Sequence, residues 1–179
     1  MKYFITSLSA FVLFGAAFVV NSCAPVAPSG GADSNAALTD AAIFDIAKQT
    51  QGYTWYKNSD AYIGRTPKSG HSEALMRTRY NATAAALLDA SGKVRSGTTF
   101  PEGSIITKEL VNADRSLSGY AVMLKRKNDP SADADGWVWG YVTGSGAVRY
   151  AVANKGAGCI GCHSIAGHID RTLMNVSVP

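Results

Sequence analysis

Several features are scarce or missing in this chain of 179 residues, and each absence narrows its function. The chain has three cysteines and no second closely spaced Cys pair, so a four-cysteine zinc site is excluded. It has no internal repeat and no basic run interleaved with aromatic residues, and its net charge is only +4. We therefore expect no nucleic-acid partner, although the mild positive charge could favour an acidic protein partner.

Two of the cysteines lie in a short run near the C-terminus, Cys159-Ile160-Gly161-Cys162-His163. This C-x-x-C-H spacing lets two thiols bond the two vinyl groups of one porphyrin, and the following histidine can then bind the iron. A redox dithiol and half of a zinc site are the alternatives, but no βαβ unit surrounds the run. The sequence predicts one covalent haem c attached through Cys159 and Cys162, with His163 as the iron ligand.

The N-terminus has the pattern of an export signal. Lys2 precedes an almost unbroken apolar stretch, and Cys23 follows the small residue Ser22, as in the cleavage box of bacterial lipoproteins. We predict a signal peptide over 1–22, a lipid anchor on Cys23 and a flexible tether over 23–36, with the protein on the periplasmic side of the cell envelope. An ordinary signal peptide or a retained membrane helix remain alternatives. Export agrees with the haem motif, because covalent haem c is assembled outside the cytoplasm in bacteria.

Residues 37–179 are predicted to form one haem-binding domain of the α+β class, mainly an antiparallel β-sheet with flanking helices and a C-terminal haem-attachment segment. Apolar spacing and N-cap residues predict helices over 40–51 and 82–90. Alternating runs separated by Gly, Asn and Asp turns predict strands over 75–80, 104–111, 119–127, 137–143 and 147–152.

Five segments in a fixed order resemble the cytochrome P-460 family, which also includes cytochrome c′-β. The resemblance covers about residues 70 to 171. The matching segments are Phe100–Glu109, Gly119–Lys125, Asp135–Trp139, Cys159–Ser164 and Asp170.

This resemblance implies a mostly antiparallel β domain that is usually a homodimer, with a five-coordinate, His-ligated haem that is open on its other face. Some members oxidise hydroxylamine with a haem cross-linked to a lysine, which maps onto Lys108; others bind nitric oxide. Strand alternation puts Lys108 on one face with Ile106 and Leu110, but the opposite face is also largely apolar. A lysine that snorkels at a sheet edge is the alternative for Lys108.

Two functions follow as hypotheses. In the first, an open iron site binds or oxidises small nitrogen oxides, nitric oxide or hydroxylamine, and exchanges electrons with a redox partner protein. In the second, the protein is a six-coordinate, membrane-tethered electron-transfer cytochrome c, with a methionine such as Met174 as sixth ligand. His71 is a candidate distal group, whereas His168 is expected at the surface. Glu102 and Glu109 are candidate bases if the protein is an enzyme, but the sequence favours a turn residue for Glu102 and an exposed strand residue for Glu109.

Overall fold

The structure, a computed structural model, describes residues 36–179 and is built on one seven-stranded antiparallel sheet. The strands follow the order β1-β3-β4-β5-β6-β7, with β2 also paired to β3. Their bounds are β1 Thr54–Trp55, β2 Ile63–Gly64, β3 Leu75–Tyr80, β4 Ile105–Val111, β5 Leu117–Lys125, β6 Trp137–Thr143 and β7 Val148–Tyr150. The α+β, mainly antiparallel prediction is confirmed. The predicted signal peptide, Cys23 and nearly all of the predicted tether lie outside the described residues.

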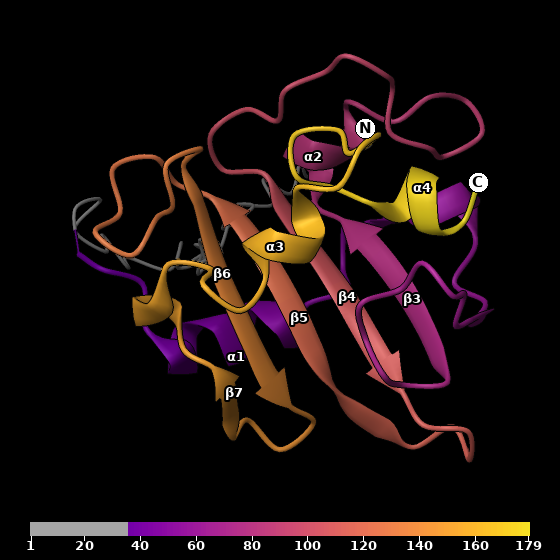
Figure 1. Ribbon diagram of the computed structural model, residues 1–179, viewed down its shortest axis with the longest axis horizontal. Coiled ribbons are helices and arrows are strands. Elements are labelled where there is room, and N and C mark those ends of the chain that lie inside the picture. Colours follow the sequence, from indigo (N-terminus) through magenta and orange to yellow (C-terminus); the bar gives the residue numbers. More distant parts are fainter. Residues whose placement is uncertain (1–35) are drawn as a thin grey trace, which may run out of the picture. The chain divides into compact units, whose positions relative to one another are not determined.

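Short helices lie on both sides of this sheet. Figure 1 shows α1 behind the strands and α3 and α4 in front of them. The α-helices are α1 Asp40–Lys48, α2 Ala82–Ala85, α3 Ile160–His163 and α4 Met174–Ser177, and the 3-10 turns are η1 Tyr56–Asn58 and η2 Val152–Asn154.

The first helix is fixed by its cap and by its buried side. The Thr39 side chain accepts a hydrogen bond from the Ala42 backbone N–H at 3.1 Å, which caps the free amides of the first turn. Ile43 and Ala47 are fully buried and pack on the sheet with Val138. The helix ends at residue 48, three residues earlier than predicted.

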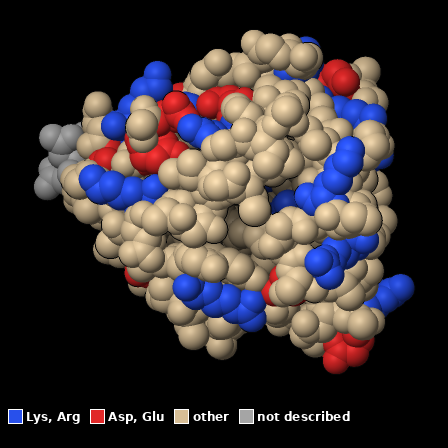
Figure 2. Space-filling view, in the orientation of Figure 1, with Lys and Arg blue, Asp and Glu red and all other residues tan. Residues whose placement is uncertain are grey.

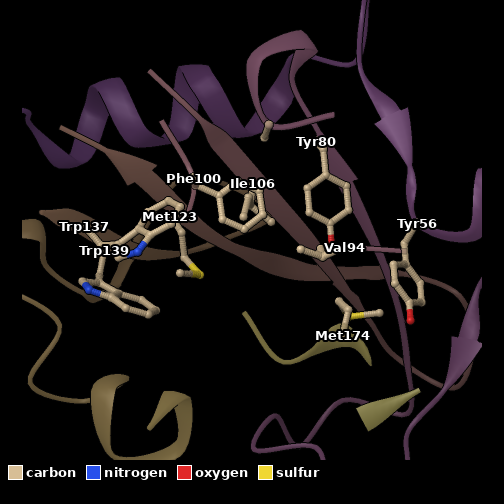
Figure 3. Packing of buried hydrophobic residues seen from close by; sticks show 10 residues of the cluster. Tyr56, Tyr80, Val94, Phe100, Ile106, Met123, Trp137, Trp139 and Met174 are labelled. Carbon is tan, nitrogen blue, oxygen red and sulfur yellow. The ribbon is translucent and has the colours of Figure 1, made fainter. Parts of the chain in front are cut away.

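Successive side chains of each strand point alternately into two apolar cores, one on each side of the sheet. Val122 and Val138 face α1, whereas Met123 and Trp137 belong to the core on the other side of the sheet (Figure 3). Because helices and loops cover both faces, the strands carry apolar residues on both. This is why the sequence alone did not settle which face of β4 turns toward the site.

Two rows of cross-strand neighbours form the surface that faces away from α1. The register of β3 to β6 sets the first row as Tyr80, Ile106, Met123 and Trp139, and the second as Thr78, Lys108, Ala121 and Tyr141. Lys108 therefore stands in the middle of this surface, between two small neighbours.

Element boundaries depart from prediction where turns compete with regular structure. β3 and β6 have the predicted limits, whereas α2 stops at Ala85, five residues early. The chain there folds into a turn that is closed by a bridge between Leu88 and Val94. β7 covers only three of the six predicted residues, because the chain turns into η2 directly after it.

Candidate functional site

The C-x-x-C-H run forms a single turn of helix at the front of the sheet. The His163 backbone N–H donates to the Cys159 carbonyl oxygen at 3.1 Å, which closes α3. Residues three apart on a helix share a side, and the thiol-bearing Cys159 and Cys162 line one cavity. Burial raises the pKa of the Cys159 thiol, and the nearby Cys162 adds to the rise.

The His163 ring is held at two places. Its Nδ1 lies 2.6 Å from the Arg171 carbonyl oxygen, and its ring meets the Trp139 ring edge-on, with centroids 4.8 Å apart. A carbonyl can only accept, so Nδ1 carries the ring proton and Nε2 keeps a free lone pair. Burial lowers the pKa of His163 to about 4, although the hydrogen bond to Arg171 opposes this. The neutral ring with a free Nε2 is the form that binds a metal.

The carbonyl that holds His163 belongs to a tight two-residue turn. Ile169 and Thr172 bridge each other, and Asp170 and Arg171 between them have φ angles of 42° and 70°. Such left-handed backbone costs free energy in non-glycine residues and persists only where the surroundings fix it.

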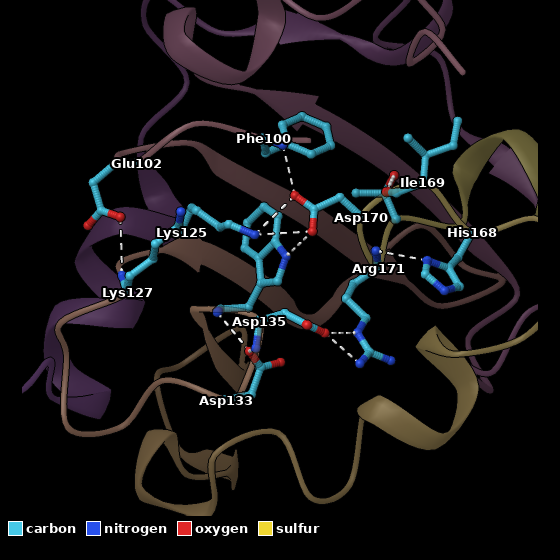
Figure 4. Close-up of polar contacts among 12 residues, drawn as sticks. Phe100, Glu102, Lys125, Lys127, Asp133, Asp135, His168, Ile169, Asp170 and Arg171 are labelled. Atoms are coloured by element: carbon cyan, nitrogen blue, oxygen red, sulfur yellow. Dashed lines mark hydrogen bonds and ion pairs between the residues drawn. The ribbon is translucent and has the colours of Figure 1, made fainter. Parts of the chain in front are cut away.

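The Asp170 side chain fixes this turn to the rest of the fold. Its carboxylate accepts from the Phe100 backbone N–H at 2.8 Å, from Trp137 Nε1 at 3.2 Å and from Lys125 Nζ at 3.0 Å (Figure 4). The Lys125 side chain is 2% exposed and that of Asp170 is 10% exposed, so this ion pair is buried. The same turn is tied on its outer side by the Arg171 guanidinium, which pairs with Asp135 and donates to Ser164.

A cavity of about 370 Å³ lies between the haem-attachment turn and the sheet. Both rows of cross-strand neighbours line it, together with Cys159, Cys162 and His163. Its walls are mainly apolar, and they include Leu173 and Met174. Figure 2 shows this face of the molecule hollowed near its centre. The predicted attachment residues and Lys108 are thus brought together.

Lys108 extends into the cavity without a partner. Within residues 36–179 its ammonium group makes no hydrogen bond or ion pair, and its cross-strand neighbours are Thr78 and Ala121. Burial lowers the pKa of Lys108 to about 8, so about a tenth of the amine is in its neutral, nucleophilic form at pH 7.

His71 also lines the cavity, from the loop between β2 and β3. Its ring meets the Tyr141 ring edge-on, with centroids 5.8 Å apart. The Tyr141 hydroxyl donates to Glu73 at 2.7 Å, and Arg149 pairs with the same carboxylate at 2.9 Å. Burial raises the pKa of Glu73, but the hydrogen bonds from Tyr141, Arg149 and Ser118 outweigh it and lower the value to about 2.

Of the other residues named from the sequence, one lines the cavity and two are exposed. Met174 lines the cavity, but its sulfur already accepts a hydrogen bond from the Thr78 hydroxyl at 3.2 Å. His168 is exposed, as expected. Glu102 is exposed and accepts from the Lys127 backbone.

The prediction that Glu109 is a candidate base in the site is wrong. Glu109 pairs with Arg77 and Arg79 on the α1 side of the sheet, because odd-numbered residues of β4 face that side. The prediction for Glu102 fails for a different reason, since this residue lies in the turn before β4 and outside the cavity lining.

Comparison with protein families agrees with this architecture. The family model described as Cytochrome P460 matches residues 68–172, which is more than half of the chain. The chain belongs to the cytochrome P460 family. It is therefore a c-type haem protein that carries one covalent haem and its iron. Searches of curated proteins and of solved structures give no match.

The cavity of this cytochrome has the donor set that a haem c requires. Two thiols and one neutral imidazole with a free Nε2 face an apolar space, and a carbonyl orients the imidazole from behind, as is usual for metal-ligating histidines. Gly70 packs so closely that a Cβ there would lie 3.2 Å from Cys162 Sγ. Residues 36–179 contain no group of three or more His, Cys, Asp or Glu that could hold a metal ion without a haem.

Sequence reasoning missed the Glu73–Tyr141–Arg149 cluster of this cytochrome. Strand alternation in β6 does put Tyr141 on the same face as Trp139, so the sequence could have indicated that Tyr141 faces the cavity. Glu73 lies in a loop, and nothing local indicates that it is buried.

Within the described residues, no helix is long and apolar enough to cross a membrane.

Proposed function

We propose that this chain is an exported monohaem cytochrome that binds small nitrogen oxides at an open iron site. Cys159 and Cys162 would hold the haem through thioether bonds, and His163 Nε2 would be the axial ligand. The haem would supply an iron atom able to bind a small ligand on its other face. The observation that carries the proposal is a cavity with largely apolar walls that is lined by both His163 and Lys108.

The methionines give limited support for a filled sixth position. The Met174 sulfur is engaged by the Thr78 hydroxyl in a buried contact, and losing that contact would leave a buried hydroxyl unpaired. Met123 lines the cavity as well, and it packs into the core cluster on this side of the sheet. An open site therefore requires no rearrangement of either side chain.

Oxidation of hydroxylamine is the second form of the proposal, and Lys108 favours it. Lys108 lines the cavity, has a pKa of about 8 and makes no hydrogen bond or ion pair within residues 36–179, so it is suited to form a covalent bond to a haem edge. Oxidation also releases electrons, so it would require a redox partner protein. The family resemblance assigns the cross-link to the position of Lys108.

The alternative function is a six-coordinate electron carrier. Met174 and His71 both line the cavity that contains His163, and either could reach the iron if the loop or α4 moved. A filled sixth position would exclude gases and favour electron transfer. In either form we propose lipid anchoring through Cys23, a periplasmic location and a homodimer.

The optical spectrum of the purified ferrous protein, before and after addition of nitric oxide, tests the proposal. A high-spin spectrum that changes with the gas is the expected result. A red-shifted Soret band would indicate a haem modified by Lys108, and the shift should disappear in Lys108→Met. A sharp low-spin spectrum that nitric oxide leaves unchanged would contradict the open site and support the electron carrier.

A further inference from the structure

His71 is a polar side chain of the cavity with unused hydrogen-bonding capacity. Neither of its ring nitrogens bonds to another residue within 36–179, and it lies on an otherwise largely apolar lining. We propose that His71 donates a hydrogen bond to the oxygen atom of a nitrogen oxide bound in this cavity. This rests on the proposed function and assigns a role to a residue outside the haem-attachment motif.

The loop that carries His71 packs directly against the haem-attachment turn. Gly70 lies so close to Cys162 that an added Cβ would be 3.2 Å from its sulfur. The His71 backbone N–H is held by the Ser69 hydroxyl at 3.3 Å. The loop therefore contacts one of the two proposed attachment points through Gly70, and the next residue, His71, lines the same cavity as Cys162.

The Tyr141 ring fixes the orientation of the His71 ring. Tyr141 packs edge-on against His71 at an interplanar angle of 81°. Its own hydroxyl is bound by Glu73 and, at 2.6 Å, by Arg149. Because the Tyr141 hydroxyl is held by the buried carboxylate of Glu73 and by the exposed Arg149, the ring that packs against the imidazole is fixed in place. A donor held in place binds a ligand with less loss of conformational freedom.

The charge state of His71 suits a neutral diatomic ligand. Burial lowers the pKa of His71 to about 3, the positive charge of Lys108 adds to the shift, and Glu73 opposes it. At neutral pH the ring is uncharged and keeps one N–H donor. The nearby hydroxyls of Thr78 and Tyr141 are already engaged by Met174 and Glu73.

The test compares the full-length, haem-loaded protein with two variants, His71→Leu and His71→Gln. The probe is nitric oxide added to the ferrous protein. The readouts are the N–O stretching frequency and the dissociation rate of the gas. In His71→Leu we expect a higher frequency and release about tenfold faster, the effect of losing one hydrogen bond to the ligand. His71→Gln keeps an N–H donor, so its frequency and release rate should lie between those of the wild type and those of His71→Leu.

Lys68→Ala is the matched control, because Lys68 is an exposed residue of the same loop that does not line the cavity. It should leave both readouts unchanged. Equal frequencies and release rates in the wild type and His71→Leu would overturn the proposal. So would a six-coordinate wild-type spectrum that becomes five-coordinate in His71→Leu, since His71 would then be an iron ligand.

The proposed function can fail separately. A wild-type ferrous haem that never binds nitric oxide refutes that function, and the role of His71 with it. A wild type that binds the gas and a His71→Leu variant that matches it refute the role of His71 alone. If His71→Leu does not load haem, His71→Gln against Lys68→Ala gives the same comparison.

Discussion

Asp170 connects three parts of the fold to the turn that positions His163. Replacing it by asparagine keeps the shape but removes the charge that pairs with the buried Lys125 ammonium. We predict that Asp170→Asn lowers the free energy of unfolding by about 3 kcal/mol, the usual cost of leaving one member of a buried pair alone. Urea unfolding measures the change.

The control for this prediction is Asp45→Asn. Asp45 pairs with Lys48 on the exposed side of α1, where an ion pair contributes little. Its loss should change the free energy of unfolding by less than about 0.5 kcal/mol. Equal effects of the two substitutions would show that Asp170 is not an anchor.

Glu73 should make stability depend on pH in the acid range. Its pKa is about 2 in the folded protein, against 4.5 as the ordinary value, so the folded state binds the proton more weakly than the unfolded chain. The stabilisation is fully present above pH 4.5 and is lost as the pH falls toward 2. The stability difference between wild type and Glu73→Gln should shrink over that range in urea titrations. A difference that stays constant with pH would refute the assignment.

At the scale of elements, α1 packs closely against β6. A Cβ added to Gly140 would lie 2.7 Å from a methyl group of the fully buried Ile43. We predict that Gly140→Ala destabilises the protein by about 1–3 kcal/mol, because the helix must shift to make room. Thermal unfolding gives the measurement.

Gly64→Ala is the control for Gly140→Ala, since a Cβ at Gly64 meets nothing within 4 Å. That variant should stay within about 0.5 kcal/mol of the wild type. If Gly64→Ala is as damaging as Gly140→Ala, the cost does not come from the contact with Ile43.

The sequence predicted the meander well because each strand has its own alternation and its own turn. β3 and β6 were placed to the residue. It could not decide which face of β4 meets the site, because both faces are buried. The misplacement of Glu109 follows from this limit, since a carboxylate near a motif says nothing about the face it occupies, whereas Glu102 lies in the turn before β4. The pairing of Glu73 with Tyr141 and Arg149 depends on residues 68 and 76 positions apart, which local patterns do not report.

At the scale of the whole molecule, the N-terminal segment should decide where the protein resides. If Cys23 carries the lipid, Cys23→Ser should move the haem-containing protein from the membrane fraction to the soluble periplasmic fraction. Ser29→Ala, in the predicted tether, should leave it on the membrane. Wild-type protein that is already soluble would indicate an ordinary signal peptide, and a variant that stays with the membrane would indicate a retained helix.

Nitric oxide titration of the ferrous wild-type protein tests the central claim most directly. The absorbance of the haem is followed as the gas is added under anaerobic conditions. An iron held by His163 and open on its other face predicts a spectral change that saturates at about one nitric oxide per haem. No change, even with the gas in excess, would mean that a side chain fills the sixth position and that this cytochrome transfers electrons instead.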